Sequence, residues 1–96
     1  MRFTWDPAKS AANVAARRFD FAFATLVFDS LTLNREDTRE DYGERRIAAI
    51  GLASDLTLTV VYTDRIADDG EVERRIISAR RSSRRERKAY ETFKGA

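Results

Sequence analysis

Alternation of apolar and polar side chains is clearest in the second half of the chain. Between residues 56 and 65, leucine, valine and tyrosine alternate with threonine, the period of two that predicts a half-buried strand. Weaker alternation predicts two further strands over residues 45–53 and 72–80. The Ala53-Ser54-Asp55 link predicts a hairpin turn, and residues 67–70 predict a longer one. We therefore expect a three-stranded antiparallel meander.

The C-terminal region is expected to pass from a strand into a helix. Ser83, followed three residues later by Glu86, forms the capping-box pattern that opens a helix. Arg84, Arg85 and Arg87 then lie near the positive end of the helix dipole, which disfavours cations. A docked polyanion would offset that cost, although a solvated basic face is the simpler interpretation. In the preceding strand, the period of two places Val72, Ile76 and Ser78 on one side and Ile77 and Ala79 on the other.

Two helices are expected before the sheet. Asp6 and Pro7 are typical of an N-cap and a first helical turn, and Asp20 predicts a second cap. The segment from Asp20 to Phe28 is strongly apolar, so it predicts a second helix that packs into the core. In the first helix, the close-packing face is expected to be Ala8, Ala11, Ala12 and Ala15, with a polar stripe of Lys9, Asn13 and Arg17 on another face.

Residues 29–43 separate the predicted helices from the predicted sheet. The segment is polar and acidic, so we expect a loop with room for one short edge strand. The chain, residues 1–96, is therefore predicted to be a single α+β domain. Its expected architecture is two N-terminal helices, a three- to four-stranded largely antiparallel sheet and a C-terminal helix.

Composition narrows the available chemistry. The chain has neither cysteine nor histidine, so it lacks disulfides, thiolate ligands and the commonest acid–base group near neutral pH. The carboxylates are scattered and the glycines dispersed, so we expect no metal site and no cofactor. No signal peptide or membrane-length apolar run occurs, which predicts a cytoplasmic protein without a membrane partner.

Charge is unevenly distributed along the chain. The formal net charge is only +2, yet residues 29–44 carry six acidic residues against two arginines. Residues 72–96 carry nine basic residues against three acidic ones. A basic end of this kind favours a polyanionic ligand.

Several motifs follow one another over nearly the whole chain. They are Phe3-x-Trp5-Asp6-Pro7-x-Lys9-x-x-x-Asn13, Phe21–Phe28, Tyr42-Gly43-Glu44-x-Arg46 with Ile50-Gly51, Val60-Val61-Tyr62-Thr63, and Arg75–Arg80 continuing to Arg84-x-Glu86-Arg87 and Tyr90. In this order they resemble the BrnT toxins of bacterial type II toxin–antitoxin systems. The resemblance implies a RelE-like ribonuclease fold and a toxin that cleaves RNA, inhibiting translation and growth. It also implies a BrnA-type antitoxin with a ribbon-helix-helix DNA-binding domain, a toxin–antitoxin hetero-oligomer, and contact with promoter DNA only through that complex.

One departure from the resembled pattern concerns the end of the first helix. Members of that family typically carry Lys-His-Gly where this chain has Ala16-Arg17-Arg18. If that histidine contributes to catalysis, its replacement weakens, reroutes or removes activity. The alternative function is therefore a homologue that binds antitoxin or RNA without cutting. A DNA-binding module is a third and weaker interpretation, because the C-terminal helix, although basic, does not resemble the recognition helix of a helix-turn-helix motif.

Cleavage of RNA without a metal needs cations for the phosphorane and groups that move protons. Arg46, Arg80, Arg81 and Arg84 are the predicted catalytic cations, and Glu44 is the predicted general base. Because Arg46 begins one strand and Arg80 ends another, we expect them at one rim. Glu44 could instead simply pair with a neighbouring arginine. The predicted RNA-binding residues are Lys9, Asn13, Arg17, Arg85, Arg87 and Lys88, and the alternative proton donors Tyr62 and Tyr90 are more typical of core positions.

Overall fold

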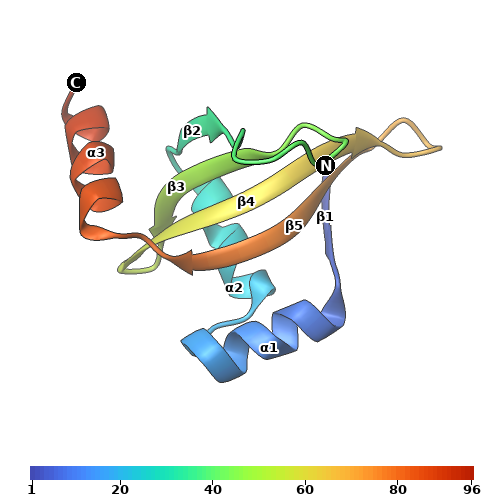
Figure 1. The fold of residues 1–96 in the computed structure, drawn as a ribbon, viewed down its shortest axis with the longest axis horizontal. Coiled ribbons are helices and arrows are strands. Elements are labelled where there is room, and N and C mark those ends of the chain that lie inside the picture. The colour runs from blue at the N-terminus through green and yellow to red at the C-terminus, as the bar shows by residue number, and fades with distance from the viewer.

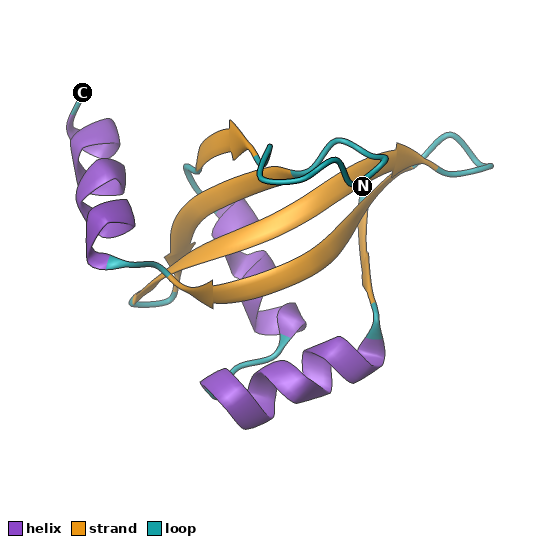
Figure 2. Cartoon of the chain, viewed as in Figure 1, coloured by secondary structure: helices purple, strands orange, loops and turns teal.

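The computed structural model describes all residues, 1–96, which form one curved sheet with helices on one of its sides. Figure 1 shows α1 and α2 on one side of the sheet, while α3 stands apart at the end where β5 finishes. Figure 2 shows the strands as one continuous curved layer. The elements are β1 (Arg2–Trp5), α1 (Pro7–Arg17), α2 (Phe21–Ala24), the 3-10 helix η1 (Thr25–Asp29), β2 (Leu33–Glu36), β3 (Ile47–Ala53), β4 (Leu56–Ile66), β5 (Val72–Arg81) and α3 (Arg84–Gly95).

The sheet has five strands in the order β1-β5-β4-β3-β2. The predicted antiparallel meander is confirmed as β3, β4 and β5, and the predicted edge strand is β2, antiparallel to β3. The predicted strand count was wrong, because β1 pairs with β5 in parallel, from Arg2 opposite Glu73 to Trp5 opposite Ile76. The sheet is therefore mixed. No local pattern indicates a partner that lies some seventy residues further along the chain.

The helix starts follow the predicted caps. Asp6 accepts a hydrogen bond from the Ala8 amide at 2.9 Å, and Asp20 accepts one from the Phe23 amide at 2.8 Å. Ser83 and Glu86 complete the capping box of α3. The second helix is shorter than expected, because regular α-helix ends after one turn and the apolar segment continues as the 3-10 helix η1.

The core lies between the sheet and the helical segments α2 and η1. Ala24 and Val27 are fully buried, and they pack in the same cluster as Leu58 and Val60 of β4. Burying each such leucine or valine contributes roughly 1.5–3 kcal/mol. Gly51 allows β3 to pack closely against η1, because a Cβ atom at this position would lie only 3.0 Å from the Val27 Cβ.

A bulge in β5 changes which residues face the core. Val61 pairs with Ser78 while Tyr62 pairs with Ile76, so Ile77 has no partner in the ladder. Ile76 and Ala79 are consequently both buried in the core, although the period of two placed them on opposite sides. That prediction was wrong because the extra residue in the bulge reverses the alternation.

The close-packing face predicted for α1 was also wrong. The buried residues of this helix are Ser10 and Asn13, whereas its alanines are exposed. Ser10 Oγ accepts a hydrogen bond from the Phe21 amide at 3.0 Å, and Asn13 Nδ2 donates to the Phe19 carbonyl at 3.0 Å. Since α1 turns directly into α2, the tight turn needs polar partners for its backbone more than it needs apolar volume.

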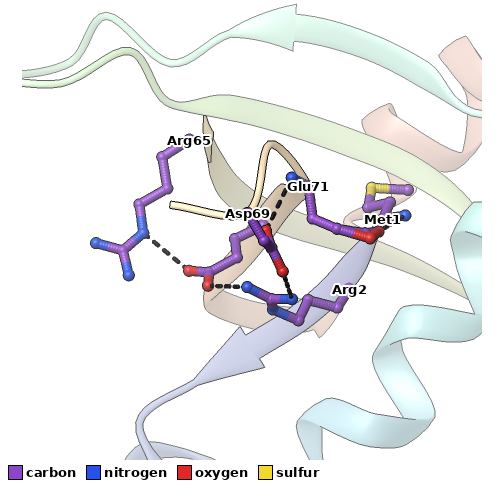
Figure 3. Close-up of polar contacts among 6 residues, drawn as sticks. Met1, Arg2, Arg65, Asp69 and Glu71 are labelled. Carbon is purple, nitrogen blue, oxygen red and sulfur yellow. Dashed lines mark hydrogen bonds and ion pairs between the residues drawn. The ribbon is translucent and has the colours of Figure 1, made fainter. Parts of the chain in front are cut away.

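Ion pairs attach β1 to the far end of the β4–β5 hairpin (Figure 3). Arg2 contacts Asp69 at 3.1 Å and Glu73 at 3.0 Å, and Arg65 contacts Glu73 at 2.9 Å. The N-terminal ammonium adds a contact of 2.7 Å to Glu71. Three of these ion pairs therefore join β1 to the hairpin, in place of the covalent turn that an antiparallel neighbour would have. Hydrogen bonds from Arg2 and then Arg65 lower the pKa of Glu73.

This cluster predicts a measurable dependence of stability on acid. Because the pKa of Glu73 is lower in the folded chain than in the unfolded one, its contribution is present above the unfolded pKa and is lost as the pH falls. We expect Glu73→Gln to flatten the pH dependence of the free energy of unfolding between about pH 5 and pH 3. Urea titrations at each pH measure the free energy of unfolding of the wild type and the variant. Glu40→Gln, at an exposed site without an ion pair, is the control, and parallel curves for both variants would contradict the prediction.

Candidate functional site

A hollow of about 500 Å³ lies on the sheet face opposite α2 and η1. Its floor includes Ala48 of β3 and Thr59 and Val61 of β4, residues that alternate with the core-facing ones. Thr59 is buried and shares a hydrogen bond of 2.8 Å with Ser82. We call this feature the arginine hollow, because its walls carry Arg17, Arg35, Arg39 and Arg80, together with the carboxylates Glu36, Asp37 and Glu86.

Separate segments of the chain supply these arginines. Arg17 ends α1, Arg35 lies in β2, Arg39 belongs to the loop between β2 and β3, and Arg80 lies near the end of β5. The loop, residues 37–46, is closed at its base by a hydrogen bond of 2.8 Å from the Asp37 amide to the Arg46 carbonyl. Tertiary structure therefore gathers cations that are up to 63 residues apart in sequence around one cavity.

Arg80 is held by a two-point ion pair. Its guanidinium donates to both carboxylate oxygens of Glu86, at 2.6 and 2.9 Å. Glu86 also accepts from the Ser83 amide at 2.7 Å, so the residue that caps α3 also orients Arg80. The hydrogen bonds from Arg80 lower the pKa of Glu86 to about 2. A carboxylate this acidic is a poor general base near neutral pH, so its role at the hollow is to position the arginine.

Arg39 and Asp37 form a second two-point pair within the loop. The guanidinium contacts the two carboxylate oxygens at 2.9 Å each, and these hydrogen bonds lower the pKa of Asp37. Asp37 is almost fully buried as a side chain, whereas 75% of the Arg39 side chain is exposed. The pair therefore orders the loop while leaving the face of the guanidinium open to a ligand.

Arg17 and Arg35 make no ion pair, so they supply the uncompensated positive charge of the hollow. Arg17 donates to Asn13 Oδ1 at 2.9 Å. Asn13 is only 4% exposed, and its side-chain amide also donates to the Phe19 carbonyl, so Asn13 holds Arg17 from inside the protein. The RNA-binding role of Asn13 stays a prediction. Lys9 is exposed on α1 and does not line the hollow.

Glu44 and Arg46 lie outside the arginine hollow. They pair with each other at 3.0 Å, and the Arg46 guanidinium lies 4.0 Å above the ring of Tyr42. The expectation that Arg46 and Arg80 share a rim was wrong. Because β3 and β5 are both antiparallel to β4, they run in the same direction. Ile47, at the start of β3, and Ile76, in the middle of β5, both pair with Tyr62, whereas Arg80 pairs with Thr59 further along the sheet.

The remaining basic residues at the C-terminal corner stay exposed. Arg81 follows Arg80 in β5 and so points to the other face of the sheet. Arg87 donates to the Ser82 carbonyl at 2.8 Å, while Arg84 and Lys88 have no carboxylate partner. Arg85 lines a separate groove beside α3. These residues widen the positive surface without entering the hollow, and their predicted roles stay predictions.

The two tyrosines considered as proton donors both lie away from the hollow. Tyr62 is 7% exposed in the core, and its burial raises its pKa. Tyr90 is 1% exposed and donates its hydroxyl to the Leu31 carbonyl at 2.7 Å, which fixes α3 to the segment before β2. The interpretation of both as core residues is confirmed.

Sequence reasoning missed Arg35 and Arg39, together with the neighbouring carboxylates of the hollow. They lie in a segment that reads as an acidic loop, and no motif marks them. The recurring arginines among acids in residues 35–39 were the available signal, because a purely solvating acidic loop has no need of them.

A curved sheet with helices on one face and a cation-lined hollow on the other defines a small α+β protein suited to binding a polyanion. The chain belongs to the family of BrnT ribonuclease toxins of type II toxin–antitoxin systems, whose family model matches residues 5–86. The match confirms the resemblance seen in the motifs. Among curated proteins, no match to the chain was found. None of its helices has the length and apolarity needed to cross a membrane, and no group of three or more metal-ligating side chains is assembled.

Proposed function

We propose that this chain is an RNA-cleaving toxin whose active site is the arginine hollow. Family membership supplies the class of reaction, and one observation carries the location: four arginines from distant segments surround one cavity on the open sheet face. Guanidinium groups stay ionised and can donate two hydrogen bonds to one phosphate, which suits a phosphodiester.

The proposed reaction is attack of a ribose 2′-hydroxyl on the adjacent phosphorus. The 2′-oxygen bonds to phosphorus as the bond to the 5′-oxygen breaks, so the products are a 2′,3′-cyclic phosphate and a free 5′-hydroxyl. The 2′-hydroxyl gives up its proton to a base, and the leaving oxygen gains one. Arg17, Arg35 and Arg80 stabilise the doubly charged phosphorane, and the Glu86 pair keeps Arg80 in place before substrate arrives.

Among the carboxylates that line the hollow, Glu36 is the one that is not held in a two-point ion pair. Asp37 and Glu86 each use both oxygens in two-point pairs, and those pairs lower their pKa. Glu36 uses one oxygen, at 3.1 Å to Arg45, and 48% of its side chain is exposed. Its second oxygen remains available to a substrate hydroxyl. We therefore assign the base to Glu36 in place of the predicted Glu44.

Cleavage by the purified chain is expected to persist in EDTA and to leave cyclic or 3′-phosphate ends. The physical reason is that the arginines of the hollow supply the charge that a metal would otherwise supply. The measurement is gel analysis of one labelled RNA with and without chelator, followed by analysis of the product termini. Loss of activity on chelation and its recovery with Mg²⁺ would refute this mechanism.

The same assay separates the two candidate bases. Glu36→Gln should lower the rate by about 10²-fold, the lower end for losing a positioned base. Glu44→Gln serves as the matched control, because it removes an equal charge outside the hollow and should leave the rate nearly unchanged. The reverse pattern would return the assignment to Glu44.

A second function, binding without cutting, is favoured by one observation. The chain has no histidine, and Arg17 occupies a wall of the hollow where a proton shuttle would serve. In that case the hollow binds RNA and antitoxin but turns over slowly or not at all. The same RNA assay distinguishes the two functions, since binding without products supports the second.

We further propose that a BrnA-type antitoxin, carrying a ribbon-helix-helix domain, neutralises the toxin by covering the hollow and the basic residues from Arg80 to Lys88. The toxin then inhibits translation only when free, and promoter DNA is bound only through the complex. We expect saturating antitoxin to reduce the affinity of the toxin for RNA by at least about tenfold. The antitoxin itself should bind the toxin less tightly at high salt, because salt screens charged contacts. Fluorescence anisotropy of labelled RNA, with and without antitoxin and at several salt concentrations, measures both effects. A ternary complex with unchanged RNA affinity would contradict this.

A further inference from the structure

A second cavity adjoins the arginine hollow between α3 and the outer strands of the sheet. Its volume is about 770 Å³, and its apolar lining consists of Leu33, Ile50 and Ala89. We call it the α3 groove. Leu33 and Ile50 are paired in the β2–β3 ladder, so they form one patch of the sheet face, and Ala89 faces them from α3. Arg85 and Ser83 complete the wall on the helix side.

The two cavities share a wall. Arg35, Arg80 and Glu86 line both of them, so a ligand can pass from one to the other around the same guanidinium groups. On β3, Ala48 belongs to the floor of the hollow and Ile50 to the groove. These residues are two positions apart on the same face, a step of about 7 Å along the strand. The phosphate and the base of one nucleotide are separated by a comparable distance.

The chemistry of the α3 groove differs from that of the hollow. Apolar side chains form its floor, and Arg35, Arg80 and Arg85 stand at its rim, with Glu86 already engaged by Arg80. Arg85 makes no ion pair, so its planar guanidinium is free to stack. A nucleobase presents flat, weakly polar faces and is attached to anionic phosphates, and proteins bind such bases on apolar and arginine surfaces.

We propose that the α3 groove is a nucleobase subsite, which receives a base of the RNA strand while the neighbouring phosphate lies in the arginine hollow. The inference rests on the proposed function, because it takes the hollow as the phosphate site. An apolar side chain of a protein partner would also fit the floor. The net positive rim and the continuity with the hollow favour the nucleotide.

The test compares the affinities of two 2′-deoxy hexanucleotides that carry equal charge and cannot be cleaved, one with thymine bases and one abasic. We expect the wild-type chain to bind the base-bearing oligomer roughly 5- to 150-fold more tightly, the range for stacking one base. Ala89→Leu, which narrows the groove opposite Leu33 and Ile50, should remove that advantage while leaving the affinity for the abasic oligomer unchanged. Ala12→Leu is the matched control, since Ala12 is an exposed helical alanine on α1, far from the groove.

Arg85→Ala provides an independent variant that removes a stacking surface from the rim and should also reduce the advantage of the base-bearing oligomer. Equal binding of the two oligomers by the wild type, or an advantage that survives Ala89→Leu, overturns the subsite. Loss of antitoxin binding by Ala89→Leu with base preference intact assigns the groove to the protein partner and also overturns it. Wild-type RNA cleavage is measured in parallel. Cleavage without base preference defeats the subsite alone, whereas absence of both cleavage and oligomer binding defeats the proposed function as well.

Discussion

Replacing Arg80 by alanine is expected to lower single-turnover RNA cleavage by about 10²–10³-fold, the usual cost of removing one preorganised donor to a developing oxyanion. RNA affinity should fall as well, because the same guanidinium attracts the ground-state phosphate. Arg80 is the cation of the hollow with the most rigid support, through its two hydrogen bonds to Glu86. Loss of Arg80 therefore removes both the charge and its orientation.

Arg81→Ala is the control for that experiment. The two arginines are adjacent in β5, but they point to opposite faces of the sheet, and only Arg80 lines the hollow. Arg81→Ala should change the rate by no more than a few-fold, through its effect on long-range attraction. Thermal denaturation of both variants establishes that α3 remains docked. Equal losses for the two variants would place the site on the C-terminal basic corner as a whole.

Arg80→Lys refines the interpretation of the Arg80→Ala result. Lysine keeps the charge but cannot make the two-point contact with Glu86 or with a phosphate. If orientation matters as much as charge, Arg80→Lys should retain most of the RNA affinity and lose much of the rate. A fully active lysine variant would show that charge alone suffices.

Arg17→His is expected to raise the cleavage rate with little change in RNA affinity, and the gain from a positioned proton shuttle can reach about 10²–10⁴-fold. Arginine is ionised at all relevant pH values and is a poor shuttle, whereas histidine has an unperturbed pKa of about 6.5. Position 17 lines the hollow, and Asn13 Oδ1 already accepts a hydrogen bond from the side chain there. The same amide oxygen can hold an imidazole N–H in a fixed orientation.

The pH dependence of the rate identifies the origin of any gain. A histidine shuttle should introduce a rate maximum near neutral pH that the wild-type chain lacks. Arg17→Gln is the control, since it removes the charge without adding a titrating group, and it should weaken binding. A histidine variant no faster than the wild type would show that this site does not transfer protons through position 17.

Arg80→Ala and Arg17→His test two different sides of the arginine hollow. Arg80 is fixed from the α3 side by Glu86, and Arg17 is fixed from the α1 side by Asn13. Each positioning residue also holds its own helix, since Glu86 caps α3 and Asn13 closes the turn after α1. The positions of the two helices and the geometry of the hollow are therefore coupled, and a change that loosens either cap should affect catalysis as well as stability.

The helix starts and the meander could be predicted from the sequence because their causes are local. Asp6, Asp20 and Ser83 satisfy amides only two or three residues away. The alternation of β4 is visible within eleven residues, and the two-residue link after Ala53 limits β3 and β4 to a hairpin. Each of these features depends on residues that are neighbours in sequence, so it can be predicted without knowing the tertiary structure.

The parallel strand β1, the bulge and the true faces of β5 were decided by tertiary structure. Pairing of Arg2 with Glu73 joins segments that no local pattern relates, and the bulge at Ile77 reverses an alternation that the sequence alone leaves uninterrupted. The direction of β3 relative to β5 follows from strand order, which is why Arg46 lies at the wrong end of the sheet to join Arg80.

For the candidate site, the sequence by itself showed that neither histidine nor cysteine is available, which directs attention to arginines and carboxylates. It also pointed to Arg17 and Arg80 as candidates, because they lie in segments with recognisable motifs. Only the tertiary structure decided that Arg35 and Arg39 join them, since the β2–β3 hairpin carries an acidic loop over the open face of the sheet. Composition fixes which chemical groups are available, whereas strand order and register fix which of them meet.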